Sequence, residues 1–241
     1  GNLKWILGEQ GEQIGECKEP RDLAVDDEGQ VYVLDTWNAR VQVFSPTGDI
    51  VMDYPVPGGS NGIAVGSVPL AVFDRESKDL EIPDAPLLGA TMTFIANTAG
   101  RNIVVVNKNG DQTQTWGAGK LVEPVDVEIT SKGLAVADAR AKKVSWYDGR
   151  GRFLHEWDIP TETTGDQTNE LKLAWDEKRK LLLVTDPTHD KLFVYSEKGD
   201  IILDTTVEGG PSGVGVTRDG RVFIAAKREG KILLVPVPTK R

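Results

Sequence analysis

A pattern of four short strands that recurs along the chain constrains the fold more than any other feature of the sequence. The copies begin at Glu19, Ser60, Glu123, Asn169 and Pro211, and the second is interrupted and resumes at Thr91. The first copy reads EPRDLAVDDEGQVYVLDTWNARVQVFSPTGDIV. In each full copy a charged turn follows the first apolar strand, and a tight turn that ends in Gly precedes the last strand, as antiparallel hairpins require. One such copy cannot bury both of its faces, so neighbouring copies must pack on one another.

Four antiparallel strands in about 40 to 45 residues are typical of a β-propeller blade. We therefore predict an all-β fold and a single propeller domain over residues 1–241. The predicted blades are residues 20–56, 59–118, 121–159, 165–207, and 209–241 together with 1–8. The second interval is about 20 residues too long for one blade. We assign the excess to an insertion at residues 66–90 in a five-bladed fold, with a degenerate sixth blade as the alternative.

The two ends of the sequence complement each other. The last copy stops after its third strand, whereas Leu3–Leu7 has the length and the aromatic residue, Trp5, of a fourth strand. We expect this segment to pair with Ile232–Val237 and to complete the last blade, because closure removes exposed sheet edges.

Composition excludes several classes of function. Lys and Arg number 28 against 37 Asp and Glu, so the net charge is −9 and a basic nucleic-acid footprint is not expected. The longest apolar run has about six residues where a membrane span needs about 20, so no membrane insertion of this chain is expected. The single Cys17 rules out an internal disulfide. Because the chain begins at Gly1, we interpret it as a processed chain or as a piece excised from a longer one. We expect it to be part of a larger bacterial protein, with an extracytoplasmic location favoured over a cytoplasmic one.

The first copy resembles the NHL repeat of bacterial β-propeller proteins. The matching features are Pro20 before LAVD, the turn at Gly29, the strand pair VYVLDTWNARVQVF and the closing Gly48, whereas residues 37–40 replace the repeat's Asn-His-Leu. The resemblance implies a propeller whose function lies among binding scaffolds, a lyase, kinase sensor domains and RNA-binding domains.

Residues that recur at one position of the repeat most often have structural roles. We predict Asx-type turns at the acids that end the second strands, Asp35, Asp138 and Asp186. We predict packing between blades for the aromatic residues of the fourth strands, Trp5, Tyr54, Trp116 and Trp157. Trp146 and Trp175 are predicted to lie in the core.

Loops that join the second and third strands share one face of a propeller, and that face is the usual binding surface. Alignment of the copies places on it eight candidate ligand-binding residues: Arg21, Trp37, Arg40, Asn61, Arg101, Arg140, His189 and Arg228. Arg and Trp are preferred anchors for anionic or aromatic groups. Arg21 and Trp37 are the strongest candidates, because other copies carry smaller residues at those positions.

The sequence offers little support for catalysis. The only histidines, His155 and His189, lie in different parts of the repeat, so the several histidines expected for the family's metal-dependent lyase are absent. Cys17 has no neighbouring His and is predicted to be an inert thiol. We predict no catalytic residue, no cofactor and no metal site. The alternative is a calcium-dependent lactonase of the gluconolactonase type, with Glu19, Asn61 and Asp186 as candidate ligands.

The sequence therefore predicts a monomeric, non-catalytic binding module. The expected partner is a protein segment or a carbohydrate-like polymer.

Overall fold

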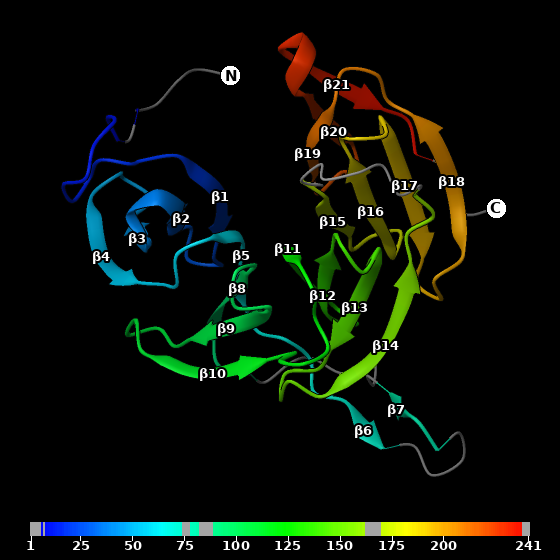
Figure 1. Ribbon diagram of the computed structural model, residues 1–241, viewed down its shortest axis with the longest axis horizontal. Coiled ribbons are helices and arrows are strands. Elements are labelled where there is room, and N and C mark those ends of the chain that lie inside the picture. Colours follow the sequence, from blue (N-terminus) through cyan, green and yellow to red (C-terminus); the bar gives the residue numbers. More distant parts are fainter. Residues whose placement is uncertain (1–5, 7, 74–77, 82–88, 162–169, 238–241) are drawn as a thin grey trace. The chain divides into compact units, whose positions relative to one another are not determined.

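The computed structural model describes residues 6, 8–73, 78–81, 89–161 and 170–237. The described residues form an all-β structure with five larger antiparallel sheets and one small hairpin (Figure 1). No helix among them is long and apolar enough to cross a membrane. Contacts divide the chain into two compact units: residues 1–67 with 88–127 form unit 1, and residues 68–87 with 128–241 form unit 2.

Unit 1 contains the first two sheets. The first is β1 (Pro20–Val25), β2 (Val31–Asp35), β3 (Arg40–Phe44) and β4 (Ile50–Pro55), in chain order. The second is β5 (Ser60–Gly66), β8 (Met92–Asn97), β9 (Asn102–Val106) and β10 (Gln112–Trp116), also in chain order. A short 3-10 helix, η1 (Thr36–Asn38), connects β2 to β3.

The third sheet is β11 (Pro124–Thr130), β12 (Gly133–Asp138), β13 (Lys143–Tyr147) and β14 (Phe153–Asp158), and the boundary between the units falls within β11. Unit 2 also holds the fourth sheet, β15 (Lys172–Asp176), β16 (Leu181–Asp186), β17 (Lys191–Ser196) and β18 (Ile201–Thr206). The fifth sheet has three described strands, β19 (Pro211–Val216), β20 (Val222–Ala226) and β21 (Lys231–Val235), with the 3-10 helix η2 (Lys227–Glu229) between the last two.

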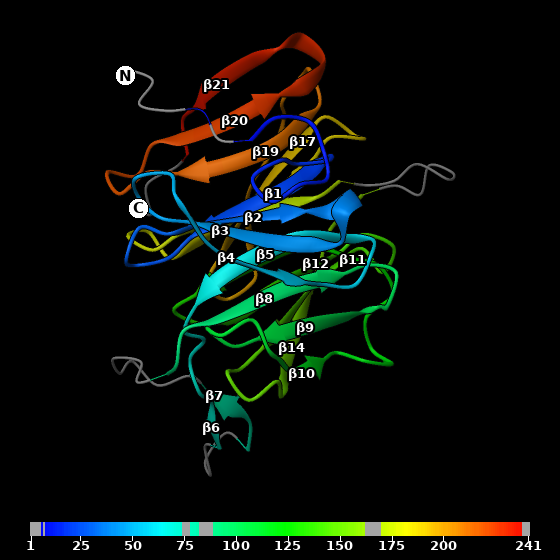
Figure 2. The same cartoon turned by 90° about the vertical axis from the view of Figure 1, so that its left-hand side faces the viewer.

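These sheets confirm the predicted all-β propeller architecture of blades built from four antiparallel strands. The described part of the insertion forms only the hairpin β6 (Val72–Phe73) and β7 (Leu80–Glu81), which supports five blades rather than six. This hairpin belongs to unit 2 and projects away from the larger sheets of that unit (Figure 2). The fourth strand expected at Leu3–Leu7 lies outside the described residues, apart from Ile6.

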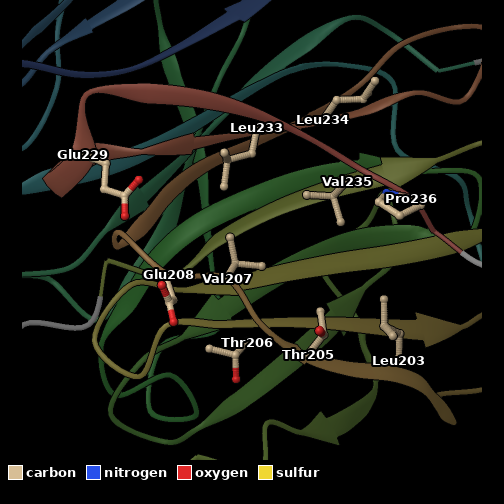
Figure 3. A pocket seen from close by; sticks show the side chains of 10 residues that line it. All are labelled: Leu203, Thr205, Thr206, Val207, Glu208, Glu229, Leu233, Leu234, Val235 and Pro236. Atoms are coloured by element: carbon tan, nitrogen blue, oxygen red, sulfur yellow. The ribbon is translucent and has the colours of Figure 1, made fainter.

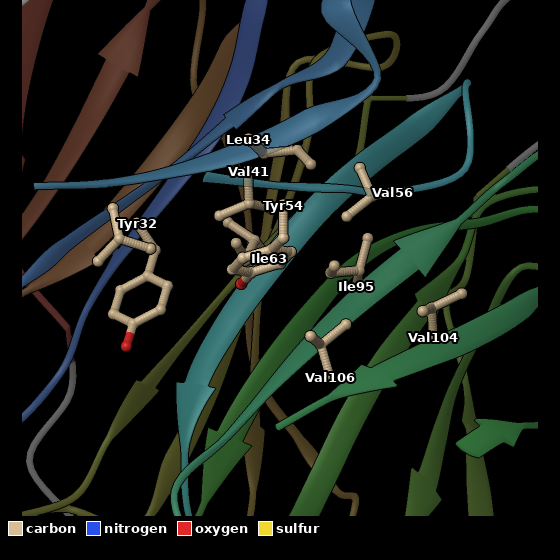
Figure 4. Packing of buried hydrophobic residues seen from close by; sticks show 10 residues of the cluster. Tyr32, Leu34, Val41, Tyr54, Val56, Ile63, Ile95, Val104 and Val106 are labelled. Carbon is tan, nitrogen blue, oxygen red and sulfur yellow. The ribbon is translucent and has the colours of Figure 1, made fainter. Parts of the chain in front are cut away.

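Each unit has its own core between neighbouring sheets. In unit 1, side chains of the first sheet, such as Leu34, Val41 and Tyr54, pack against Ile63 and Ile95 of the second (Figure 4). In unit 2, the core joins the fourth and fifth sheets through the buried side chains Leu183, Leu192, Val194, Val222 and Ile224. Within each unit, neighbouring sheets thus bury one face against each other.

Fourth-strand aromatic residues reach across to the next blade, as predicted. The Tyr54 hydroxyl lies 3.1 Å from the Thr93 hydroxyl of the second sheet. Its ring lies so close to Gly110 that a Cβ there would be 2.9 Å from the Cβ of Tyr54. Trp157 stacks on Tyr195 of the fourth sheet with ring centroids 5.7 Å apart. Trp116 is buried, and Trp5 lies outside the described residues. Trp146 and Trp175 are buried core residues, as expected.

The guanidinium of Arg179 joins the fourth and fifth sheets. It pairs with the buried Asp176 carboxylate at the start of its own turn, and it donates to the carbonyl oxygens of Gly220 and Val237, the latter at 3.2 Å. The Arg179 side chain is only 16% exposed and that of Asp176 is 2% exposed. The pair is therefore largely removed from water.

Replacement of Arg179 by Met should lower the free energy of unfolding by about 3 kcal/mol, because removal of one partner leaves the other charge buried and unpaired. Chemical denaturation followed by tryptophan fluorescence would measure the change. Arg221→Met is a matched control in the fifth sheet, since the Arg221–Asp219 pair is exposed on both sides and its loss should change stability little. Equal effects of the two substitutions would contradict a structural role for Arg179.

Tyr54→Phe should lower the free energy of unfolding by about 1 kcal/mol, because it removes a hydrogen bond between two buried hydroxyls. The neighbouring Tyr32 provides a control within the same core, since its hydroxyl lies 3.4 Å from the Asp26 carboxylate and forms a weaker bond. Thermal melts of Tyr54→Phe and Tyr32→Phe should show a larger loss for the first. A larger loss for the second would count against the hydrogen bond between the sheets.

Candidate binding surface

The turn after β2 is fixed by a buried carboxylate. Asp35 is fully buried, and its Oδ1 accepts a hydrogen bond of 2.7 Å from the Lys18 amide. Its Oδ2 accepts bonds of 2.8 Å from Asn38 Nδ2 and 2.9 Å from Arg40 Nε. A charge removed from water in this way is tolerated only when it is paired and hydrogen-bonded. Asp35 therefore ties the turn to the preceding segment and to β3.

Two further bonds hold η1 in place. The Thr36 hydroxyl donates to the Ser60 carbonyl of β5 at 2.9 Å, and the Trp37 amide donates to the Lys18 carbonyl at 3.2 Å. The turn ends at Ala39, whose φ of 51° lies in the left-handed region. The Trp37 side chain, by contrast, lies 60% exposed on this fixed turn. The backbone of the turn is thus ordered while its indole faces solvent.

Strand register places three other predicted residues at the same end of unit 1. In the first sheet Pro20 pairs with Asp35, which puts Arg21 at the end that carries Trp37. In the second sheet Ser60 pairs with Asn97, so Asn61 and Arg101 share an end. The Thr36–Ser60 hydrogen bond joins the two sheet ends. We call the four residues Arg21, Trp37, Asn61 and Arg101 the Trp37 surface.

The members of this surface differ in how they are held. Arg21 is exposed and lies 3.7 Å from the Glu19 carboxylate, an exposed pair that water screens. Asn61 Nδ2 donates to the Thr98 hydroxyl at 2.8 Å. Arg101 is exposed at the end of the Thr98 turn. Two guanidinium groups and one amide therefore accompany the indole.

Arg40 has a different environment from the one that repeat alignment implied. Its side chain is only 12% exposed, and its Nη2 donates to the carbonyl oxygens of Gln13 at 2.7 Å and Glu16 at 2.9 Å. Together with its bond to Asp35, these contacts hold the segment before β1 against the first sheet. We assign Arg40 a structural role and leave it out of the Trp37 surface.

The remaining candidates lie in unit 2. Arg140 is exposed in the turn after β12. His189 Nδ1 lies 2.7 Å from the buried Asp186 carboxylate, and the His189 side chain is 17% exposed. Arg228, in η2, forms an ion pair with Asp190, whose carboxylate also accepts a 2.9 Å bond from the Gly210 amide. The turn between β16 and β17 and the turn between β20 and β21 therefore meet through Asp190.

The predicted Asx-type turns are confirmed at two of the three positions. Asp186 Oδ1 accepts from the Thr188 amide at 3.0 Å, and Asp138 Oδ1 accepts from the Ala141 amide at 3.0 Å. Asp35 differs, since the backbone amide from which it accepts is that of Lys18 in the preceding segment and not one of its own turn. Asn97, at the same position of the second sheet, forms the Asx-type turn with the Gly100 amide at 3.0 Å.

The sequence interpretation missed the role of Gln42. This side chain is fully buried, its Oε1 accepts from the Gly15 amide at 2.8 Å, and its Nε2 donates to the Glu16 carbonyl at 2.8 Å. The sequence did contain a sign of this role. At the same position of the third strand, three of the other copies carry an apolar residue and one carries Ser145, so a large amide is unusual there. A buried amide there requires a partner segment, and residues 13–17 supply it.

Burial shifts the pKa of two titratable side chains, Cys17 and His155. Burial raises the pKa of the Cys17 thiol, which favours its protonated form. Burial lowers the pKa of His155, which stacks on Trp146 with ring centroids 5.6 Å apart. Within the part of the chain that the structure describes, no three His, Cys, Asp or Glu side chains gather as a metal site would require.

Comparisons with known proteins find a repeat match and a distant relative. Residues 18–44, which include β1 to β3, match the model of the NHL repeat. Protein brain tumor from Drosophila melanogaster is 25% identical over 152 residues, which are 63% of this chain and 13% of that protein. The chain therefore spans only a small part of that relative.

Solved structures show the same fold at low sequence identity. Virginiamycin B lyase from Staphylococcus aureus superimposes with a TM-score of 0.61 at 14% identity, over 91% of this chain and 70% of the lyase chain. A protein of unknown function from Bacteroides caccae gives a TM-score of 0.54 at 12% identity, over 86% of this chain and 70% of that one. Such likeness shows the fold and not the activity. The chain is thus a β-propeller, and residues 18–44, in its first blade, match the NHL repeat.

Proposed function

We propose that this chain is a non-catalytic interaction module that binds a protein segment through the Trp37 surface. The observation that carries the proposal is the 60% exposed indole on a turn whose backbone is fixed by Asp35 and Thr36. Trp is enriched among the anchor residues of protein interfaces. NHL repeats are, in addition, typical of protein-interaction modules.

The order of the turn favours binding. Because hydrogen bonds already hold the backbone of η1, a partner need not order it, and less of the interaction energy is lost on binding. Tryptophan and arginine are also the side chains most often found at energetic hot spots of interfaces. Arg21 and Arg101 would flank the indole, so the expected ligand is a peptide with an apolar or aromatic side chain near a carboxylate.

The lactonase alternative receives less support from the same geometry. Asp186 is fully buried, and both of its carboxylate oxygens already accept bonds from Thr188 and His189. One of the three proposed ligands is thus buried and committed to its own turn.

The test begins with a random dodecapeptide library selected on the immobilised chain. Enriched peptides should bind the double variant Trp37→Ala with Arg21→Ala at least tenfold more weakly than they bind the unsubstituted chain. A loss of this size is typical when a hot-spot residue is removed from an interface. Leu23→Ala is the matched control, since Leu23 is 61% exposed on β1 of the same unit and lies outside the surface. Fluorescence anisotropy gives the affinities, and thermal melts should be unchanged for all variants.

Three results would contradict the proposal. The first is equal loss of peptide binding in Leu23→Ala and in the Trp37 variant. The second is a library that yields no peptide dependent on Trp37. The third is binding to a glycan array that requires Trp37 in the absence of such peptides, which would identify a carbohydrate-binding surface instead.

A further inference from the structure

Five turns of unit 2 lie together at one end of its sheets. In the fourth sheet the turn between β15 and β16 and the turn between β17 and β18 share an end, as the strand order requires, and the same holds for the two turns of the third sheet. The Arg179 guanidinium, in the turn after β15, donates to the Gly220 carbonyl of the turn between β19 and β20. The Lys180 ammonium donates to the Ser131 hydroxyl of the turn between β11 and β12 at 3.0 Å. The turns of all three sheets are therefore neighbours.

The sheets that carry these turns also pack on one another. Leu203 of β18 and Leu233 and Val235 of β21 line one cavity between the fourth and fifth sheets (Figure 3). Gly199, in the turn before β18, lies so close to Trp157 of the third sheet that a Cβ there would be 2.5 Å from the indole Nε1. The turns thus project from a packed support.

Basic side chains outnumber acidic ones on these turns. Nine Lys and Arg stand against six Asp and Glu, a surplus of three positive charges, in residues 131–132, 148–152, 176–180, 196–200 and 217–221. The three corresponding turns of unit 1, residues 26–30, 45–49 and 107–111, hold five acidic residues and the single Lys108. The turn itself therefore does not require basic residues, and their surplus is particular to unit 2.

Most of the acidic side chains are already paired within their own turns. Four of the six carboxylates form ion pairs: Asp148 with Arg152, Asp176 with Arg179, Glu177 with Lys180 and Asp219 with Arg221. In contrast, four cations are exposed, and no ion pair or side-chain hydrogen bond joins them to another described residue. These are Arg150, Lys178, Lys198 and Arg218, which we call the basic turn surface.

We propose that the basic turn surface binds an acidic segment of a partner protein. Cations without internal partners can pair with the carboxylates of a ligand without first breaking an ion pair. Charges are screened beyond about 8 Å at physiological ionic strength. A short acidic segment is therefore attracted by the local surplus, although the whole chain has a net charge of −9. Ile201, which follows the Lys198 turn and is 42% exposed, offers an apolar contact beside the charges.

Nucleic acid suits this surface less well than an acidic protein segment does. A long polyanion extends beyond the local surplus and meets the negative charge of the rest of the chain. Single-stranded nucleic acid is also held by aromatic side chains on which its bases stack. The five turns contain no aromatic residue.

A designed peptide tests the surface with the full chain. The probe is an acetylated and amidated dodecapeptide in which pairs of Glu alternate with single Leu or Gly residues, labelled with an uncharged fluorophore. It should bind in fluorescence anisotropy, and its affinity should fall as salt is raised, because salt screens exposed charges. The same peptide with Gln in place of every Glu should not bind.

A triple variant locates the binding. Lys178→Gln combined with Lys198→Gln and Arg218→Gln should weaken binding of the probe at least tenfold, because three exposed charge contacts are lost together. All three side chains are exposed and unpaired among the described residues, so thermal melts should be unchanged.

A control variant removes the same number of charges elsewhere: Lys108→Gln, Lys227→Gln and Lys231→Gln. Lys108 is exposed on a turn of unit 1, and the other two form ion pairs that are exposed on both sides. This variant should bind the probe like the unsubstituted chain. The double variant Trp37→Ala with Arg21→Ala should also bind it unchanged, because the Trp37 surface lies in unit 1 and shares no residue with the basic turn surface.

Five outcomes would overturn the proposal. Absence of peptide binding at low salt shows that the surface holds no acidic segment. Equal weakening in the triple variant and in its control shows that net charge alone attracts the probe. Loss of binding in the Trp37 double variant assigns the peptide to the Trp37 surface. Binding only in a chain that ends at Val237 shows that the chain's own C-terminal segment covers the surface. Tighter binding of a single-stranded DNA dodecamer, lost in the triple variant, identifies nucleic acid as the occupant.

Discussion

The packing of one sheet face on the next is the interaction on which the rest of this structure depends. A four-stranded sheet of this length cannot bury its apolar side chains alone, and the two cores show how neighbours solve the problem. In unit 1, Leu34 and Val41 of the first sheet are covered by Ile63 and Ile95 of the second. Tyr54 and Trp157 extend the contact between blades at their outer edges. Side chains at the sheet ends are thereby held on a rigid support.

The turns at those ends are ordered by buried polar groups rather than by apolar contact. Asp35 and Arg40 form a largely buried ion pair, and Gln42 adds a buried amide. Such groups are costly to desolvate, and the cost is offset here by carbonyl and amide groups of residues 13–18. The arrangement explains why an exposed Trp37 stands on a backbone that is not free to move. It also distinguishes two arginines that the sequence analysis proposed as ligand-binding residues. Arg40 is bonded to Asp35 and to the segment before β1, whereas Arg21 faces solvent.

Fold and function have to be argued separately for this chain. The likeness to virginiamycin B lyase covers most of this chain. In this chain, however, His189 is paired with Asp186 and His155 is stacked on Trp146. The proposed Trp37 surface offers an anchor side chain on a fixed turn, which suits recognition by side chains.

The sequence by itself determined the strands, the turns and the propeller architecture, because these depend on periodicity and on local turn chemistry that recur in every copy. It also identified the Asx-type turns at Asp138 and Asp186 and the packing of Tyr54 and Trp157 between blades, since a residue repeated at one position has a repeated environment. Only the tertiary structure decided the burial of Arg40 and Gln42. Burial depends on which segment lies opposite a side chain, and residues 13–17 have no counterpart in the other copies.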